Sequence, residues 1–227
     1  MADLDKHARW ADKWILLLSK EEKVRSEQFF TEKDRARYVT RRGILRMILG
    51  RYLVTNPQTI LFHTETNNKP RLICRHDGVD IRFNASHSCG IALCAFACNR
   101  EIGIDIERLI EIREMDDLID RFFHKSERKI LRALPMIEKK KAFFKCWTRK
   151  EALLKARGVG LYYPLDALDV LSCLNEDSLA FLSIQDSNET TKWVLRDINA
   201  VEGFASALAL QCDPVEPIIC VQQLHLT

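Results

Sequence analysis

The amino-acid sequence predicts an α+β fold. Segments with helical spacing of apolar residues and segments that alternate like strands occur in both halves of the 227-residue chain. They do not follow the long strand–helix–strand alternation that builds a parallel, doubly wound sheet. The length allows one large domain or two small ones around a sizeable core, and no low-complexity linker separates the halves.

Composition and charge narrow the class of protein. Hydrophobic residues make up 47% and charged residues 30% of the chain, which excludes disorder. The net charge of +3 is too small to predict a nucleic-acid binder by itself. None of the eight cysteines forms a C-x-x-C pair, the start lacks a signal-like apolar stretch, and the longest apolar run, 91–98, cannot span a bilayer. We therefore expect a reduced, cytoplasmic, soluble protein.

The first part of the chain is expected to hold one strand and two helices. Residues 10–18 form the expected strand. The pattern Ser19-Lys20-Glu21-Glu22 is typical of a capping box, which predicts a helix toward Phe30. A longer helix is expected over 31–52.

Basic residues are concentrated in this region. Residues 20–51 hold ten Lys/Arg against five acids. Arg42 and Arg46 lie one helical turn apart, so they form either a solvated face or a fork that binds one phosphate. Nucleic-acid binding through residues 20–51, without catalysis, is one hypothesis that this distribution leaves open.

Strands are expected next, over 59–65, 71–74, 79–83 and 91–98. The small polar stretch Asn84–Ser88 between the last two is expected to be a loop tip that holds ligand-binding groups. His87 could be an ordinary surface histidine, or beside Ser86 it could donate a hydrogen bond to phosphate.

The segment Gly103–Glu107 alternates apolar and acidic residues with the period of a strand. Ile104 and Ile106 would face a core, while Asp105 and Glu107 project together, with Cα atoms roughly 6.5 Å apart. They form either the solvated acidic face of a strand or a site for a hard cation such as Mg²⁺.

A helix expected over 138–156 carries the next charged groups. Glu151 and Lys155 stand one turn apart beside Lys150, and alone they indicate an exposed ion pair. A third carboxylate with adjacent lysines is also what a site for Mg²⁺ and pyrophosphate would add to Gly103–Glu107. The remaining expected elements are a helix over 119–134 and strands over 165–173, 179–184, 192–198, 204–210 and 218–224.

With these motifs in order, the chain resembles the 4′-phosphopantetheinyl transferases. The resemblance is to the longer single-chain class, typified by the surfactin-synthetase-activating enzyme and by cyanobacterial members. It covers about residues 18–167, and Asn68–Pro70 and Arg121–Phe123 are weaker matches. Four blocks carry it: Arg42–Arg46, Asn84–Ser88, Gly103–Glu107 and Trp147–Lys155.

The resemblance implies a fold and a site. The fold is a pseudo-twofold pair of similar α+β halves, residues 1–102 and 103–227, in a monomer with the active site in the cleft between them. Three groups of residues match the family's site. The metal ligands for Mg²⁺, or Mn²⁺, are Asp105, Glu107 and Glu151. The groups around the coenzyme A pyrophosphate are Ser86, His87, Lys150 and Lys155. The basic set near the 3′-phosphate and adenosine is Arg46, with Arg42 and Lys69.

The implied reaction transfers phosphopantetheine from coenzyme A to a serine of an apo acyl or peptidyl carrier protein and releases 3′,5′-ADP. Glu151, as base, metal ligand or both, would accept the serine proton, while Lys155 and His87 offset charge on phosphoryl oxygens. A Mg²⁺-dependent hydrolase that cleaves a nucleotide pyrophosphate would use the same acids and lysines. The sequence has no Walker-type glycine loop to favour that alternative.

Overall fold

The computed structural model describes residues 1–64, 69–73, 78–160, 163–171, 180–186, 189–212 and 219–220. Its N-terminal part is helical apart from one short strand. The predicted capping box at Ser19 and Glu22 is confirmed, with both hydrogen bonds formed. The elements are β1 (Ala2–Asp3), α1 (Leu4–His7), η1 (Ala8–Trp10), α2 (Ala11–Trp14), η2 (Ile15–Leu17), α3 (Lys20–Glu27), α4 (Glu32–Tyr52) and η3 (Pro57–Thr59).

The strand expected over 10–18 is wrong, because this segment forms short helical turns. Trp14 and Leu18 are buried, whereas Leu16 between them is 59% exposed. A spacing of four between buried residues belongs to a helix, and a strand would have buried all three on one face.

Two antiparallel hairpins follow the helices. β2 (Phe62–Thr64) pairs with β3 (Pro70–Leu72), and β4 (Ile81–Ser88) pairs with β5 (Ile91–Cys98). β1 adds to β5, which gives the order β1-β5-β4. Of the strands expected over 59–65 and 71–74, residues 65 and 74 lie outside the described part. α4 covers this sheet through a buried cluster that includes Leu45, Leu49 and Phe83.

The stretch Asn84–Ser88 was expected to be a loop tip, and this expectation is wrong. It is part of β4. The turn lies at Cys89 and Gly90, both with positive φ (44° and 88°). Polar side chains can be accommodated in this strand because they form hydrogen bonds with the neighbouring strand β6.

The described residues of the C-terminal part form a four-stranded antiparallel sheet and three α-helices. The sheet order is β6-β9-β8-β7. The elements are β6 (Ile102–Arg108), α5 (Met115–Phe122), α6 (Lys125–Ala133), α7 (Met136–Arg157), η5 (Leu165–Ala167), β7 (Ala180–Asp186), β8 (Glu189–Asp197) and β9 (Phe204–Cys212).

Two expectations for this part need correction, and a third falls largely outside the described residues. The helix expected over 119–134 is two helices, because His124 caps a new one with a capping box to Glu127. Residues 165–171 of the strand expected over 165–173 form η5 and an irregular segment. Of the strand expected over 218–224, only 219–220 are described, and they have no regular structure.

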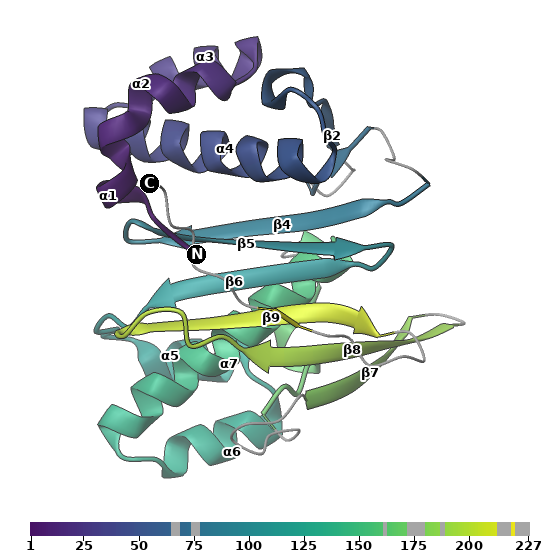
Figure 1. Cartoon of the computed structure of the whole chain (residues 1–227). Helices are drawn as coiled ribbons and strands as arrows, with labels where there is room; N and C mark the ends of the chain where they lie inside the picture. The colour runs from purple at the N-terminus through teal and green to yellow at the C-terminus, as the bar shows by residue number, and fades with distance from the viewer. Residues whose placement is uncertain are drawn as a thin grey trace.

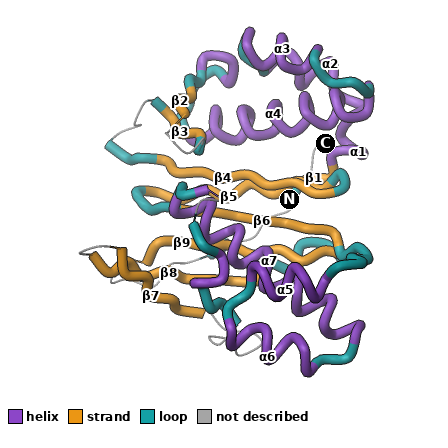
Figure 2. The backbone as a smooth tube through the Cα atoms, turned by 180° about the vertical axis from the view of Figure 1, so that it is seen from behind, coloured by secondary structure: helices purple, strands orange, loops and turns teal. Residues whose placement is uncertain are grey.

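The β1-β5-β4 sheet and the β6-β9-β8-β7 sheet lie next to each other in the middle of the molecule, and the helices lie on the outside (Figures 1 and 2). α4 covers the β1-β5-β4 sheet, and α7 packs against β6 and β9. Helices are thus segregated from antiparallel strands, and the predicted α+β class is confirmed. Among the described helices, none has the length and apolar run that crossing a membrane requires.

α7 contacts β6 at Gly103 with no space between the two backbones. A Cβ atom on Gly103 would lie 2.0 Å from the Ala152 carbonyl oxygen and 2.4 Å from the Ala156 backbone nitrogen. Only glycine allows this approach. Because Ala152 and Ala156 directly follow Glu151 and Lys155 in α7, the contact sets how these two side chains meet β6.

Replacing Gly103 with alanine should lower the free energy of unfolding by about 1–3 kcal/mol, the usual effect of overpacking. The added methyl group collides with helix backbone, which cannot turn aside as a side chain can. Chemical denaturation measures the change. A Ser183→Ala variant, on an exposed position of β7, should stay within about 0.5 kcal/mol of wild type. An unchanged midpoint for Gly103→Ala would contradict the contact.

Candidate active site

Strand β6 presents the two acids predicted from Gly103–Glu107. Ile104 and Ile106 are buried in a cluster shared with β5 and β9. Asp105 is only 2% exposed, and Glu107 is half-buried. The predicted strand is confirmed, but Asp105 lies in the interior rather than on a solvated face.

The polar residues of β4 face β6 and bond to it side by side. The Asn84 Oδ1 atom accepts from the Ile104 N–H (2.9 Å), and the Ser86 hydroxyl donates to Asp105 Oδ1 (2.9 Å). The Ser88 hydroxyl donates to Glu107 Oε2 (3.0 Å). Residue numbers rise together along both strands, so β4 and β6 run parallel although they belong to different sheets. We call this line of bonds the β4–β6 seam.

Lys155 joins the seam from α7. Its Nζ donates to Asp105 Oδ1 (2.5 Å) and to the Ser86 hydroxyl (3.1 Å). The other oxygen of Asp105, Oδ2, is buried and has no hydrogen-bond partner. A buried carboxylate oxygen without a donor is costly, so this atom is suited to contact a cation or a hydrogen-bond donor.

Three carboxylates act on one another here. Burial raises the pKa of Glu107, and the nearby charge of Asp105 adds to this effect. Burial also raises the pKa of Glu151; Lys155 opposes the rise, while Asp105 and Glu107 add to it. Glu151 makes no hydrogen bond within the described part of the chain. A carboxylate in this condition is a better base than an exposed one.

The acids fit a hard cation such as Mg²⁺ by their chemistry, and the unpartnered Asp105 Oδ2 is a suitable ligand atom. The geometry is not preformed. Among the described residues, no three His, Cys, Asp or Glu side chains are gathered closely enough to hold a metal ion. Lys155 instead neutralises part of the acidic charge.

His87 lies at the same end of β4 and is surrounded by cations. His87 has an exposed surface, but part of its ring is buried by the surrounding protein. This partial burial is the main cause that lowers the pKa of His87 to about 4. Arg41, Lys155 and Arg37 lower the pKa of His87 further. The imidazole is therefore neutral near pH 7 and donates at most one hydrogen bond.

Arg41, which the sequence reasoning missed, is the available cation beside His87. Arg37 is held by Asp5 through two hydrogen bonds of 2.6 Å. Arg41 is half-buried and contacts the Tyr38 ring at 5.7 Å, and it has no hydrogen-bond or ion-pair partner among the described residues. The signal was present, because Arg37 and Arg41 are spaced i,i+4 as Arg42 and Arg46 are.

Arg42 and Arg46 are engaged elsewhere. Both guanidinium groups bond to the carboxylate of Glu22 on α3. Arg46 is only 2% exposed and also donates to the carbonyl oxygens of Pro57 and Ile60. The predicted phosphate fork therefore holds the carboxylate of Glu22, and Arg46 is almost completely buried.

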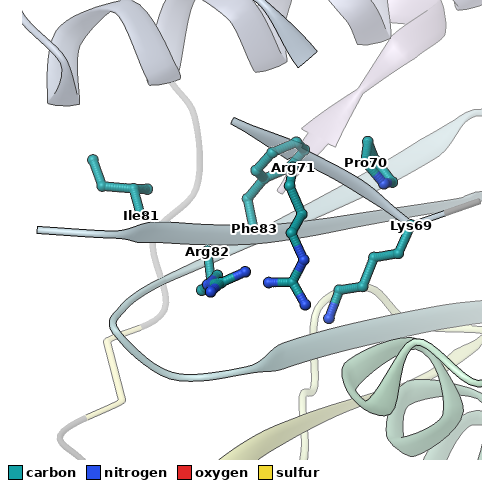
Figure 3. A pocket seen from close by; sticks show the side chains of 6 residues that line it. All are labelled: Lys69, Pro70, Arg71, Ile81, Arg82 and Phe83. Atoms are coloured by element: carbon teal, nitrogen blue, oxygen red, sulfur yellow. The ribbon is translucent and has the colours of Figure 1, made fainter. Parts of the chain in front are cut away.

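Lys69 is likewise a structural group. Its Nζ donates to Glu101 Oε2 (2.9 Å) and to the carbonyl oxygens of Ile102 (3.2 Å) and Ala156 (2.7 Å). Figure 3 shows its side chain pointing the same way as those of Arg71 and Arg82, both of which lie within 3.5 Å of Glu101. The pocket that these residues line is too tight for water. Lys69 thus ties β3 to β6 and to the C-terminal end of α7.

Lys150 is not brought to the acidic cluster. Its side chain has no exposed surface and lies 2.8 Å from Glu127 of α6. The structure therefore separates the predicted ligands. It gathers Ser86, His87, Asp105, Glu107, Glu151 and Lys155 at the β4–β6 seam, and it places Arg42, Arg46, Lys69 and Lys150 in contacts with protein groups.

Comparison with known proteins defines the class of this chain. The family model described as "4′-phosphopantetheinyl transferase, N-terminal" matches residues 7–99, and that of the "4′-phosphopantetheinyl transferase superfamily" matches residues 101–209. The chain therefore belongs to the 4′-phosphopantetheinyl transferases, a family of enzymes. The family predicted from the sequence motifs is confirmed.

Individual relatives refine the comparison. The chain is 44% identical to the 4′-phosphopantetheinyl transferase HetI of Nostoc sp., over 63% of this chain and 61% of that protein. It is 30% identical to Sfp of Bacillus subtilis, over 78% of this chain and 75% of that one. It is 31% identical to psf-1 of Bacillus pumilus, over 74% and 69% of the two chains. The similarity is to the type that HetI and Sfp represent.

Replacing Glu151 with glutamine should raise the thermal unfolding temperature at pH 7.5, because it removes one charge from a desolvated acidic cluster. Since folding raises the pKa of Glu151, the charged form is disfavoured in the folded protein, and wild-type stability falls as pH rises through that pKa. The gain from glutamine should therefore be largest at neutral pH and shrink toward pH 4.

Calorimetric or fluorescence-monitored melting of wild type and Glu151→Gln at both pH values measures this difference. Glu202→Gln, an exposed position before β9, is the matched control and should not shift the melt. A Glu151→Gln protein that is less stable than wild type at pH 7.5 would contradict the repulsive cluster.

Proposed function

We propose that this chain transfers the phosphopantetheinyl group of coenzyme A to a serine hydroxyl of an apo acyl or peptidyl carrier protein, and that 3′,5′-ADP is released. The carrying observation is the acidic cluster at the β4–β6 seam, with a buried, unpartnered Asp105 oxygen and Lys155 beside it. Family membership favours this reaction over hydrolysis of a nucleotide pyrophosphate. The relatives HetI and Sfp are named as 4′-phosphopantetheinyl transferases.

Asp105, Glu107 and Glu151 are the proposed ligands of Mg²⁺, with Mn²⁺ as an alternative. When bound, the metal would neutralise the pyrophosphate charge and polarise its oxygens. The supporting observations are the hard oxygen donors and the raised pKa values of Glu107 and Glu151. Burial is the main cause of these raised pKa values and the neighbouring carboxylates add to it, so a cation in this cluster would lower them.

The protein groups divide the chemistry among them. Glu151, whose pKa is raised, accepts the proton as the serine oxygen attacks the β-phosphorus of coenzyme A. The bond from that phosphorus to the bridging oxygen breaks, and the oxygen leaves with 3′,5′-ADP. Lys155 offsets negative charge on the phosphoryl oxygens, and the Ser86 hydroxyl holds Lys155 and Asp105 in place.

The 3′-phosphate of coenzyme A is proposed to bind at Arg41 and His87. Arg41 supplies a cation with no protein carboxylate bound to it, and neutral His87 can donate one hydrogen bond. Arg42 and Arg46 are not part of this proposed site, because both bond to the carboxylate of Glu22 and Arg46 also donates to a backbone carbonyl oxygen. Adenosine contacts of Lys69 are not part of this proposal, because its ammonium group bonds to Glu101 and two carbonyl oxygens.

The finer architecture is also a proposal. We expect residues 1–102 and 103–227 to be pseudo-twofold related halves that act together as a monomer, with substrates in the cleft between them. The two family models, which meet near residue 100, support this division. A cytoplasmic location is expected as well, and it agrees with the free thiols of Cys89, Cys94, Cys98, Cys146 and Cys220.

Nucleic-acid binding through residues 20–51 gains no support from the structure. Several of its basic residues are paired with acids of the same chain. Pairing of this kind removes the free charge that a phosphate backbone would need.

Replacing Arg41 with glutamine should weaken coenzyme A binding by about 10- to 100-fold, the usual effect of removing a charged hydrogen bond to phosphate. Binding of 3′-dephospho-coenzyme A should change much less. Calorimetric titration of both ligands measures the difference. Arg42→Gln, which keeps the pair of Glu22 with Arg46, is the control, and it should leave the difference in affinity between the two ligands unchanged. Equal losses for both ligands would remove Arg41 from the 3′-phosphate site.

The reaction itself is tested by the intact mass of an apo carrier protein incubated with this protein, coenzyme A and Mg²⁺. A gain of one phosphopantetheine that disappears with a chelator and with Glu151→Gln supports the proposal. Hydrolysis of coenzyme A with no gain on any of several carrier proteins would favour the hydrolase. Full activity of Asp105→Ala would contradict the metal assignment.

A further inference from the structure

A buried ionic network lies beneath α7, directly beside the residues proposed for catalysis. Its centre is the carboxylate of Glu127, which has no exposed surface. Oε1 accepts from the Val170 N–H (2.8 Å) and the Cys146 thiol (3.2 Å). Oε2 accepts from the His124 N–H (2.9 Å) and lies 2.8 Å from Lys150 Nζ. Every acceptor position of this carboxylate is thus supplied from within the chain.

The ammonium group of Lys150 is equally saturated. Besides its ion pair with Glu127, it donates to the carbonyl oxygens of Leu165 (2.8 Å) and Leu168, and it lies 5.5 Å from the centre of the Phe123 ring. An ammonium group has three protons, and three oxygen atoms of the chain lie within 2.8 Å of this nitrogen. Because its side chain has no exposed surface, Lys150 cannot contact a phosphate of coenzyme A without breaking this network.

The network joins three parts of the chain that no backbone ladder connects. Lys150 belongs to α7 and Glu127 to the first turn of α6. The third part is the segment 165–170 after α7, which begins with η5. Arg149 strengthens the same attachment, since it donates to the Val170 carbonyl oxygen (3.4 Å) and binds Asp197 at the end of β8. Consecutive residues of α7 are therefore fixed on adjacent sides of the helix.

Fixing Lys150 and Arg149 determines the direction of Glu151. Consecutive side chains of an α-helix project about 100° apart. The apolar side chains of α7, such as Phe143 and Leu153, pack in the core along the helix, and the contact at Gly103 sets its distance from β6. At the turn that carries Glu151, the contacts of Arg149 with Asp197 and of Lys150 with Glu127 add a polar constraint on rotation about the helix axis. Glu151 is thereby kept on the side of α7 where Asp105 and Glu107 act on it.

We propose that Lys150 is a positioning residue, which through its buried pair with Glu127 sets the rotation of α7 and so aims Glu151 at the acidic cluster. This inference rests on the proposed role of Glu151. It differs from the role that the family resemblance implies for Lys150, namely contact with the coenzyme A pyrophosphate. The two roles differ in what they predict for coenzyme A binding. Loss of a phosphate ligand would weaken the affinity for coenzyme A, whereas loss of a positioning residue would leave it nearly unchanged.

The test compares Lys150→Met, Glu127→Gln and the double variant Lys150→Met/Glu127→Gln. Removing one partner leaves the other as an uncompensated buried group, which is strongly destabilising, whereas removing both charges restores neutrality. We expect each single variant to melt about 10 °C or more below wild type and the double variant to recover much of that loss. Lys141→Met, on an exposed position of α7, is the matched control and should melt as wild type does.

Function is then measured well below each melting temperature, as the turnover number for transfer to an apo carrier protein and as the dissociation constant of coenzyme A with Mg²⁺. Positioning predicts that Lys150→Met lowers turnover at least tenfold while the dissociation constant stays within about threefold of wild type. The double variant should regain part of the lost turnover. Where Lys150→Met does not fold, the double variant carries the comparison of coenzyme A affinity.

Two results would overturn the proposal. One is a tenfold or greater loss of coenzyme A affinity that persists in the double variant, which would make Lys150 a phosphate ligand. The other is wild-type turnover in a folded Lys150→Met protein. The Glu151→Gln variant tests the role of Glu151 separately from the positioning role of Lys150. Full transfer activity in that variant would exclude Glu151 from catalysis, whatever the Lys150 variants show.

Discussion

The β4–β6 seam is the contact on which the rest of the site depends. Two parallel strands from different sheets lie side by side, and side chains rather than backbone ladders supply their hydrogen bonds. Such a seam can bury polar groups only if each finds a partner. Ser86 and Lys155 supply partners for one oxygen of Asp105, and the other oxygen remains without one. The proposed site for a cation and substrate thus lies at the joint between the two sheets.

The charged side chains fall into two groups, which differ in how far protein groups satisfy their hydrogen-bonding capacity. Lys150 and Glu127 are fully buried and satisfied by protein groups, and Arg46 bonds to Glu22 and two carbonyl oxygens. Buried charges require this, because leaving one unpaired costs several kcal/mol. Glu151 and Arg41, by contrast, keep hydrogen-bonding capacity that nothing in the described chain uses. Available capacity of this kind, more than residue type, distinguishes a group that can act on a substrate.

The acidic cluster illustrates how function opposes stability. Burial and mutual repulsion raise the pKa values of Glu107 and Glu151, so the ionised cluster destabilises the folded state. The surrounding structure holds it together through Gly103, where α7 meets β6 without space for a Cβ atom. The rigid helix, anchored by Arg149 and Lys150 on two sides, maintains an arrangement that its acids alone would not adopt.

The sequence by itself determined the family, the α+β class, and the elements α3, α4, α7 and β6, and with them the elements that carry Asp105, Glu107 and Glu151. These follow from short-range patterns, such as the capping box at Ser19 and the alternation in Gly103–Glu107. Tertiary structure decided which cations remain available. Lys150 adjoins Glu151 in sequence but turns to Glu127, and Arg42 turns to Glu22 rather than to a ligand. A charge pairs with whichever opposite charge folding brings within reach, and no local pattern shows partners that lie 20 or more residues away.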